Sequence, residues 1–311
     1  MTLARVFPRR TKATPRDALA FVGSPDLFAR SFGIEQVHVS VAFTWDKPLA
    51  EHLAEQWQRI APTEIGGPAY GAGAEFVAGQ YLGEGYTITS RGCPRDCWFC
   101  RVPKVEGQLR ELPIVPGWKV QDDNLLACSR PHFEATITML RAQPHRVEFT
   151  GGLEALLLQD WHVDAFASLS PRPTCFFAYD PGDEYGTLAT AACRMLAAGF
   201  TRASHRLRCY VLIGWPRDTF AAADQRLNAM LTLGFTPMAM LWRHPNNGLP
   251  TSEQWRQFQR RWARPAIIHR ACARPFATAA IPTSVSAMSV FGVPRTRGSA
   301  LTPLLLYAEP V

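Results

Sequence analysis

The chain has 311 residues, of which 47% are hydrophobic and 19% are charged, a composition typical of globular proteins. It contains no run of about 18 apolar residues and no apolar stretch at its N-terminus, which argues against a transmembrane helix and predicts no signal peptide. Eight cysteines without a secretory signal indicate reduced thiols, so we expect a cytoplasmic protein that is not bound to a membrane.

Residues 1–35 are rich in proline and arginine, and the sequence predicts a basic, irregular arm here. The net charge of the chain is +7 at pH 7, and part of the excess lies in this arm. Such a segment can contact phosphate groups or imitate an organellar presequence, although a solvated terminus is the commoner form. The first sixteen residues hold five basic side chains and no acidic one: Arg5, Arg9, Arg10, Lys12 and Arg16.

Residues 36–80 are expected to form a small Rossmann-like segment. Residues 36–44 alternate apolar and polar side chains, as a strand does, and residues 46–60 are expected to form a helix. A second short strand at residues 64–71 runs into a glycine-rich turn. A strand, a helix and a strand before a glycine turn are part of a Rossmann-like fold.

Three cysteines follow a short β-like run at residues 86–90. Cys93, Cys97 and Cys100 stand at C-x3-C-x2-C spacing. Three thiolates on one loop can hold three irons of a [4Fe-4S] cluster, which normally takes four cysteine ligands. The fourth iron would keep an open position for a ligand, as a catalytic zinc ion does. We therefore expect these cysteines to bind a [4Fe-4S] cluster.

A structural zinc site is the alternative for the same cysteines. It would need a fourth ligand, commonly from a second pair, but the next candidates, Cys128 and His132, belong to no such pair. A disulfide is disfavoured because nothing indicates secretion. The spacing, with a strand before it and a helix after it, favours the cluster.

The cysteine motif, with the aromatic Phe99 before its third cysteine, closely resembles that of the radical S-adenosylmethionine (SAM) superfamily. The resemblance implies that SAM chelates the open iron, beside Phe99. It also implies that the reduced cluster cleaves SAM to methionine and a 5′-deoxyadenosyl radical, with electrons from a partner such as flavodoxin or ferredoxin. No catalytic residue beyond the cluster ligands is indicated. The substrate, whether small molecule, peptide or nucleic acid, is not indicated either, because the superfamily's specificity lies in variable loops.

Residues 81–272 alternate strands and helices, a pattern that builds parallel sheets in α/β proteins. With the resemblance, this implies a partial (β/α)6 TIM-like barrel with a small Rossmann-like extension at its N-terminal side. Residues 273–311 are expected to form a partly disordered tail. We expect strands at residues 86–90, 146–150, 174–180, 207–214, 236–243 and 266–268, and helices at residues 132–142, 154–169, 185–198, 219–233 and 252–263.

A pair of glycines follows the second expected strand of this region. The superfamily carries a Gly-Gly-Glu signature here whose backbone meets the SAM amino group, and the resemblance transfers this role to Gly151 and Gly152. Leu153 moves the acid one position on, to Glu154, whose role is therefore open. The alternative is a plain turn between a strand and a helix, with Glu154 favouring the helix dipole.

Two further residues are candidates for SAM binding. Asp180, at the end of a strand, is placed to bind ribose hydroxyls, but Asp180-Pro-Gly182 is also a turn signature. Arg208 is a candidate partner of the SAM carboxylate, and a solvated outward arginine is the alternative. Residues 101–127 lack periodicity, and a surface loop or substrate contacts would explain their polar and aromatic side chains equally well: Trp118, Lys119, Asp122, Asp123 and Asn124.

The order of the segments is similar to the cobalamin-binding branch of the superfamily. That branch carries an Asp-x-His-x-x-Gly motif, which is absent here, so we expect no cobalamin. The rival hypotheses are a zinc- or cluster-stabilised nucleic-acid-binding module without catalysis, and a barrel that keeps its cluster but serves only as a partner subunit. The binding module predicts zinc and salt-sensitive binding to polynucleotides.

Overall fold

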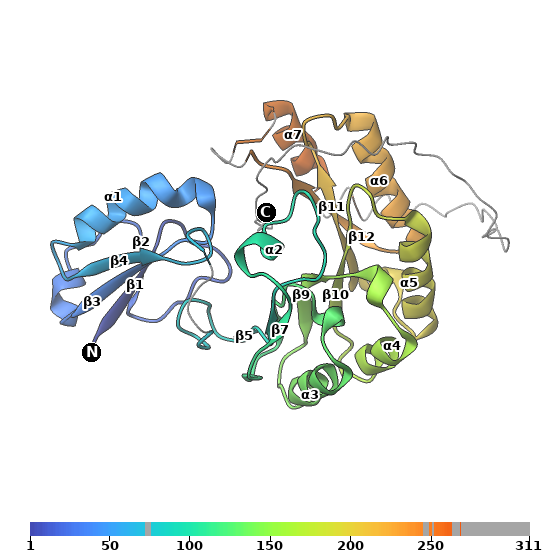
Figure 1. Ribbon diagram of the computed structural model, residues 1–311, viewed down its shortest axis with the longest axis horizontal. Helices are drawn as coiled ribbons and strands as arrows, with labels where there is room; N and C mark the ends of the chain where they lie inside the picture. The colour runs from blue at the N-terminus through green and yellow to red at the C-terminus, as the bar shows by residue number, and fades with distance from the viewer. Residues whose placement is uncertain (72–75, 245–248, 251, 263–267, 269–311) are drawn as a thin grey trace.

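The chain folds into two parallel sheets that lie side by side (Figure 1). This confirms the α/β class. The computed structural model describes residues 1–71, 76–244, 249–250, 252–262 and 268.

The N-terminal sheet has four parallel strands in the order β2-β1-β3-β4. The irregular arm expected over residues 1–35 is a wrong prediction, because this segment contributes β1 and β2, and β1 lies inside the sheet. Helix α1 packs Leu53 and Trp57 onto the sheet, and the Trp57 indole donates to the Gly23 carbonyl across 3.0 Å. The elements are β1 (Leu3–Phe7), β2 (Ala20–Val22), β3 (Gln36–Ser40), α1 (Lys47–Trp57) and β4 (Thr63–Gly66).

The second sheet has six parallel strands in the order β12-β11-β10-β9-β8-β5. The strand β8 has two residues and was not predicted; it lies between β5 and β9, so the glycine pair stands on the third strand from this edge and not on the second. The strands are β5 (Tyr86–Thr87), β8 (Lys119–Val120), β9 (Glu148–Leu153), β10 (Thr174–Tyr179), β11 (Leu207–Ile213) and β12 (Thr236–Leu241).

Helices lie along one side of the six-stranded sheet (Figure 1). The single helix expected over residues 154–169 is divided into two helical segments. Gln159 takes an extended conformation and caps the second segment, where His162 Nδ1 accepts a hydrogen bond from the Gln159 amide. The helical segments are α3 (Arg130–Arg141), η4 (Ala155–Leu157), α4 (Asp160–Ala167), α5 (Tyr185–Ala197), α6 (Phe220–Leu233) and α7 (Glu253–Trp262).

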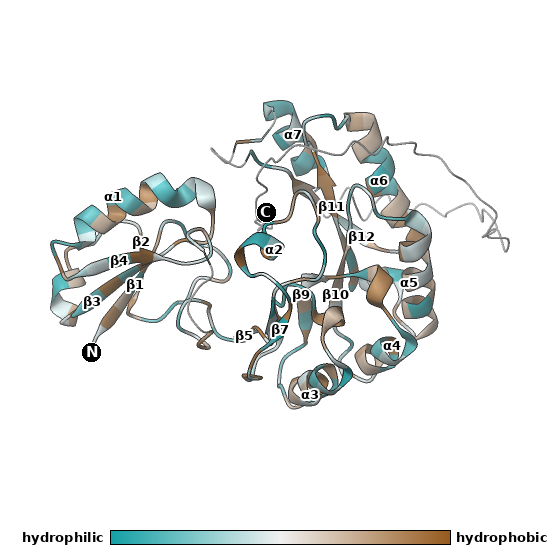
Figure 2. Cartoon of the chain, in the orientation of Figure 1, coloured by the Kyte–Doolittle hydropathy of each residue, from teal (hydrophilic) through white to brown (hydrophobic). Residues whose placement is uncertain are grey.

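The main hydrophobic core fills the space between these helices and the sheet. Apolar residues concentrate on the strands and on the inward sides of the helices (Figure 2). Phe133 and Phe149 both contact Phe166, and all three rings are fully buried. One face of the sheet is thus occupied by core packing, which leaves the other face for a site.

A short hairpin, β6 (Ser90–Arg91) with β7 (Arg110–Glu111), carries the cysteine motif beside the six-stranded sheet. The strand expected at residues 266–268 falls outside the described residues except for Ile268, and the tail at 273–311 falls wholly outside them. In the described part of the chain no helix is long and apolar enough to cross a membrane.

Candidate functional site

A cavity of about 2600 Å³ extends from the six-stranded sheet to the N-terminal sheet. Side chains alternate between the two faces of a strand, and here one set lines the cavity while the other is buried in the core. The buried set includes Val120, Phe149, Phe177 and Cys209. The set that lines the cavity comprises Lys119, Gln121, Glu148, Thr150, Phe176, Ala178, Arg208, Tyr210, Met238 and Met240.

The cysteine loop, residues 92–101, lines the same cavity. Cys93, Cys97 and Cys100 are each half-buried. The loop folds back on itself, since the Cys100 amide donates to the Cys97 carbonyl across 2.9 Å. Gly92 begins the loop at φ +86°, and a Cβ there would lie 2.2 Å from the Gln108 carbonyl oxygen, so only glycine fits.

Burial governs the acidity of two of these thiols. It raises the pKa of Cys100 to about 12, and it also raises the pKa of Cys97, which the nearby Arg95 partly opposes. Both thiols are therefore protonated at neutral pH in the metal-free chain. Binding of a metal would release these protons, because the thiolate is the ligand.

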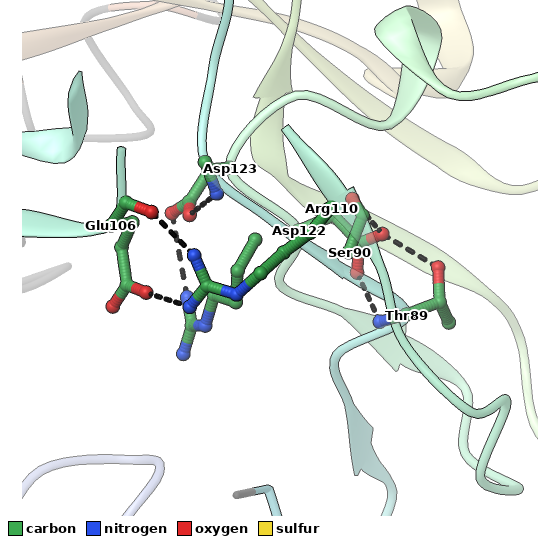
Figure 3. Close-up of polar contacts among 8 residues, drawn as sticks. Thr89, Ser90, Glu106, Arg110, Asp122 and Asp123 are labelled. Carbon is green, nitrogen blue, oxygen red and sulfur yellow. Dashed lines mark hydrogen bonds and ion pairs between the residues drawn. The ribbon is translucent and has the colours of Figure 1, made fainter. Parts of the chain in front are cut away.

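Asp122 and Asp123 hold the strand that leads into the cysteine loop (Figure 3). The Asp122 carboxylate is buried and accepts three hydrogen bonds, from the Thr89 amide and from the hydroxyls of Thr89 and Ser90, at 2.6–2.7 Å. Asp123 accepts from the Gly92 amide across 2.9 Å. Burial raises the pKa of both carboxyls, that of Asp123 to about 6. These two residues therefore anchor the loop, rather than pointing freely at a substrate.

Asn124 completes this series by contacting a cysteine directly. Its amide nitrogen lies 3.4 Å from Cys93 Sγ and 2.8 Å from Glu154 Oε2. Both partners are acceptors, which fixes the orientation of the amide. Asn124 lines the cavity, and its Oδ1 is buried and has no hydrogen-bond partner among the described residues. An unused buried acceptor beside Cys93 is suited to a ligand that brings a donor.

Arg95 ties the cysteine loop to two other strands. Its guanidinium lies 2.9 Å from Glu154, which follows β9, and 3.1 Å from Asp183, which follows β10. Arg95 was not selected from the sequence, because both carboxylates are far away along the chain. Its position between two cysteines of the motif was the one available signal.

Glycine occupies the two positions of the Gly-Gly pair for different structural reasons. A Cβ at Gly151 would lie 1.7 Å from the Asp122 carbonyl oxygen, so close packing of the two backbones requires glycine there. Gly152 has φ +91° and nothing within 4 Å of a Cβ, beside the cavity. Only Gly152 therefore combines a conformation that favours glycine with open space for a ligand. Glu154 lines the cavity but is engaged with Arg95 and Asn124.

Asp180 follows β10 and lines the cavity. The Asp183 amide donates to the Asp180 carbonyl across 3.0 Å, so the expected turn is present. Burial, with the negative charge of Asp183, raises the pKa of the Asp180 carboxyl to about 7. At neutral pH this group is a hydrogen-bond donor in part of the molecules.

Arg208 lies on the cavity face but far from the cysteine loop along its strand. It is the second of seven residues of β11, whereas the loops that contact the cysteines follow the carboxyl ends of the strands. Its Nε donates to the His205 carbonyl across 3.2 Å, and the guanidinium covers the Phe176 ring. Arg208 is thus separated from the other candidates and is half-buried rather than solvated.

Two aromatic residues separate Cys97 from Cys100. Phe99 is buried, whereas Trp98 is 48% exposed and lies edge-on to Trp215, with 6.5 Å between ring centroids. Phe99 was predicted from the sequence as a site residue, whereas Trp98 was not. Exposed indole surface inside a cavity wall is available for stacking.

No three His, Cys, Asp or Glu side chains of the described part converge to hold a single metal ion. The three cysteines of the motif are half-buried on one loop that lines the cavity. Cys128, Cys175 and Cys209 are buried in the core, as expected for small apolar residues.

A scan against models of known protein families finds no match to this chain, and a search among curated proteins finds no relative. The function is therefore inferred from the site itself.

Proposed function

We propose that this protein is a radical SAM enzyme. Cys93, Cys97 and Cys100 would hold a [4Fe-4S] cluster, and SAM would bind its open iron. The cluster, once reduced by a partner such as flavodoxin or ferredoxin, supplies the electron that cleaves SAM to a 5′-deoxyadenosyl radical. The observation that carries the proposal is a half-buried C-x3-C-x2-C loop on the wall of a large cavity, beside a six-stranded parallel sheet.

The residues around the loop support this proposal by their chemistry. Asn124 Oδ1 is a buried acceptor next to Cys93 and would accept from the SAM ammonium group. Gly152 offers backbone in open space, where a ligand can approach closely. Asp180 lines the same cavity and can bond ribose hydroxyls. Arg208 is not a candidate for the SAM carboxylate, because it lies at the opposite end of its strand.

The chain itself would bind and orient the cluster and SAM and would keep solvent away from them. Asp122, Asp123 and Arg95 hold the cysteine loop against the six-stranded sheet, so the ligands are preorganised. The core seals one face of the sheet, and the cavity faces the other. A cavity wall that excludes solvent would protect a reactive radical from side reactions.

The test is anaerobic reconstitution of the full chain, followed by iron and sulfide analysis and by assay of 5′-deoxyadenosine under reduction. The proposal predicts iron and sulfide in about equal amounts and 5′-deoxyadenosine release that Cys97→Ala abolishes. Zinc in place of iron, with no SAM cleavage, would favour a metal-stabilised binding module. A cluster without SAM cleavage would favour a non-catalytic partner subunit.

A further inference from the structure

The loop that follows β1, residues 8–16 and called here the basic loop, presents three unpaired cations to the cavity. Arg10, Lys12 and Arg16 are exposed and line the cavity. Within the described residues none of the three makes a hydrogen bond or an ion pair. The two other basic residues of this region are used internally: Arg5 binds Asp17, and Arg9 Nε binds the buried Asp46 across 2.9 Å.

The basic loop is held in shape by its own threonines. The Thr11 amide donates to Thr14 Oγ1 across 2.8 Å, and Thr14 is buried. The Gly83 amide donates to the Ala13 carbonyl across 2.7 Å, which fastens the loop to a second segment. The three cations are therefore displayed from a fixed backbone, which lowers the entropic cost of binding an anion.

The loop stands where parallel sheets bind ligands. In the strand order β2-β1-β3-β4 the chain adds β2 on one side of β1 and then β3 on the other side, so β1 is a topological switch point. Ligands occupy the crevice beyond the carboxyl ends of the strands at such a point. The loop leaves the carboxyl end of β1 at this position. The N-terminal sheet and the six-stranded sheet lie side by side (Figure 1). Residues of both sheets line the cavity.

Several acidic groups of the same cavity are engaged by arginines of the chain: Asp46, Asp123, Glu154 and Asp183. Asp96, Glu148 and Glu184 also line the cavity and have no ion pair among the described residues. The positive charge available to a polyanion is therefore concentrated at the basic loop and is not spread over the whole cavity.

An exposed aromatic ring accompanies the cations. Trp98 is 48% exposed on the cysteine loop and lines the cavity, whereas the ring of Tyr70, which also lines it, is covered by the Lys47 ammonium at 4.4 Å. Grooves that bind single-stranded nucleic acid combine basic side chains with aromatic rings on which bases stack, each worth about 1–3 kcal/mol. An acidic peptide would use the cations but not the rings. A cavity of about 2600 Å³ also exceeds the roughly 300–1,000 Å³ typical of small-molecule sites.

We propose that the cavity binds a single-stranded polynucleotide segment, with its phosphates on Arg10, Lys12 and Arg16 and a nucleotide beside Trp98. The cations and the ring line the same cavity, so one strand would contact both. That this nucleotide is the reacting one rests on the proposed function, whereas the binding itself does not.

The test is fluorescence anisotropy with labelled RNA and DNA oligonucleotides of about 15 nucleotides, titrated with the full chain between 50 and 200 mM salt. The variant Arg10→Gln/Lys12→Gln/Arg16→Gln is compared with a control that removes the same charge elsewhere, Arg30→Gln/Arg59→Gln/Arg146→Gln. These control residues are exposed and lie outside the cavity lining. RNA and DNA share the phosphodiester chemistry, and the oligonucleotide that binds more tightly identifies which of the two is the natural ligand.

We expect the basic-loop variant to bind at least tenfold more weakly, with a salt slope smaller by about 2, since each phosphate contact to a single strand contributes about 0.7. The control should bind within threefold of the unmodified chain. Equal binding by both variants, or displacement of the probe by polyglutamate as readily as by an unlabelled oligonucleotide, would overturn the proposal. The iron and SAM-cleavage assays use no oligonucleotide. They therefore test the proposed function independently of the oligonucleotide-binding experiment.

Discussion

The side-chain amide of Asn124 donates to Cys93 Sγ across 3.4 Å. The two residues are 31 positions apart, and the same amide also binds Glu154. Hydrogen bonds to ligand sulfurs stabilise the more negative, reduced state of an iron–sulfur cluster. Asn124 is therefore placed to influence the redox properties of a cluster held by Cys93.

Asn124→Leu should lower the reduction potential of the reconstituted cluster. Loss of the hydrogen bond should shift the midpoint by roughly 40 mV to more negative values, the one-electron equivalent of about 1 kcal/mol. The measurement is an EPR-monitored redox titration. Asn228→Leu, on the exposed face of α6, is the control, and an unchanged midpoint in Asn124→Leu would show that the contact has no electronic role.

Arg95→Gln should weaken the hold of the cysteine loop on the six-stranded sheet. The substitution removes the ion pairs to Glu154 and Asp183, and because the Arg95 side chain is 40% exposed the effect is moderated by solvent. We expect several-fold faster loss of iron to a chelator, followed by absorbance. Arg30→Gln serves as the control, and equal rates in the two variants would contradict the assigned role.

The two glycines after β9 should respond differently to alanine. Gly151→Ala places a Cβ 1.7 Å from the Asp122 carbonyl oxygen and should cost about 3 kcal/mol or more of stability. Gly152→Ala strains only its own backbone and should cost about 1–2 kcal/mol, while weakening SAM binding in the reconstituted protein.

Urea unfolding of the two metal-free variants and calorimetric titration with SAM separate these effects. A stable Gly151→Ala, or a Gly152→Ala that binds SAM as tightly as the unmodified chain, would contradict this division of roles.

Much of the six-stranded sheet could be predicted from sequence, but its short strands could not. Long apolar runs such as β10 and β11 carry a clear local signal. The strand β8 has only two residues, and β1 has an uninterrupted buried run from Ala4 to Phe7 in place of alternation. Both are defined by their pairing partners, which local periodicity does not reveal.

The candidate site shows the same limit. The cysteine spacing directed attention to one loop whose residues are close in sequence, and the structure places that loop on the cavity wall. Asp122, Asn124 and Arg95 support that loop through partners about 30 to 90 residues away, which no local pattern records. Arg208 was selected as a candidate for its charge. As the second residue of the strand expected at residues 207–214 it already lay at the amino end, and the strand pairing confirms that position.

His162 should make the stability of the chain depend on pH. It is buried against Phe133 and Trp161, and burial lowers its pKa to about 4, from about 6.5 when exposed. Between these values the unfolded chain binds more protons than the folded one, so stability is full near pH 7 and declines as the pH falls toward 4.

We expect a loss of about 2 kcal/mol between pH 7 and pH 5 in the metal-free chain, measured by urea unfolding. His162→Gln keeps an acceptor for the Gln159 amide at a position where Gln is common, and should flatten this dependence. An identical pH profile in the variant would show that other groups cause it.

The most direct test of the central claim is EPR of the anaerobically reconstituted, reduced chain with and without SAM. An open iron predicts a [4Fe-4S] signal that changes when SAM is added and that is absent in Cys93→Ala, Cys97→Ala and Cys100→Ala. A signal indifferent to SAM, or a chain that retains only zinc, would contradict the assignment of this loop to SAM cleavage.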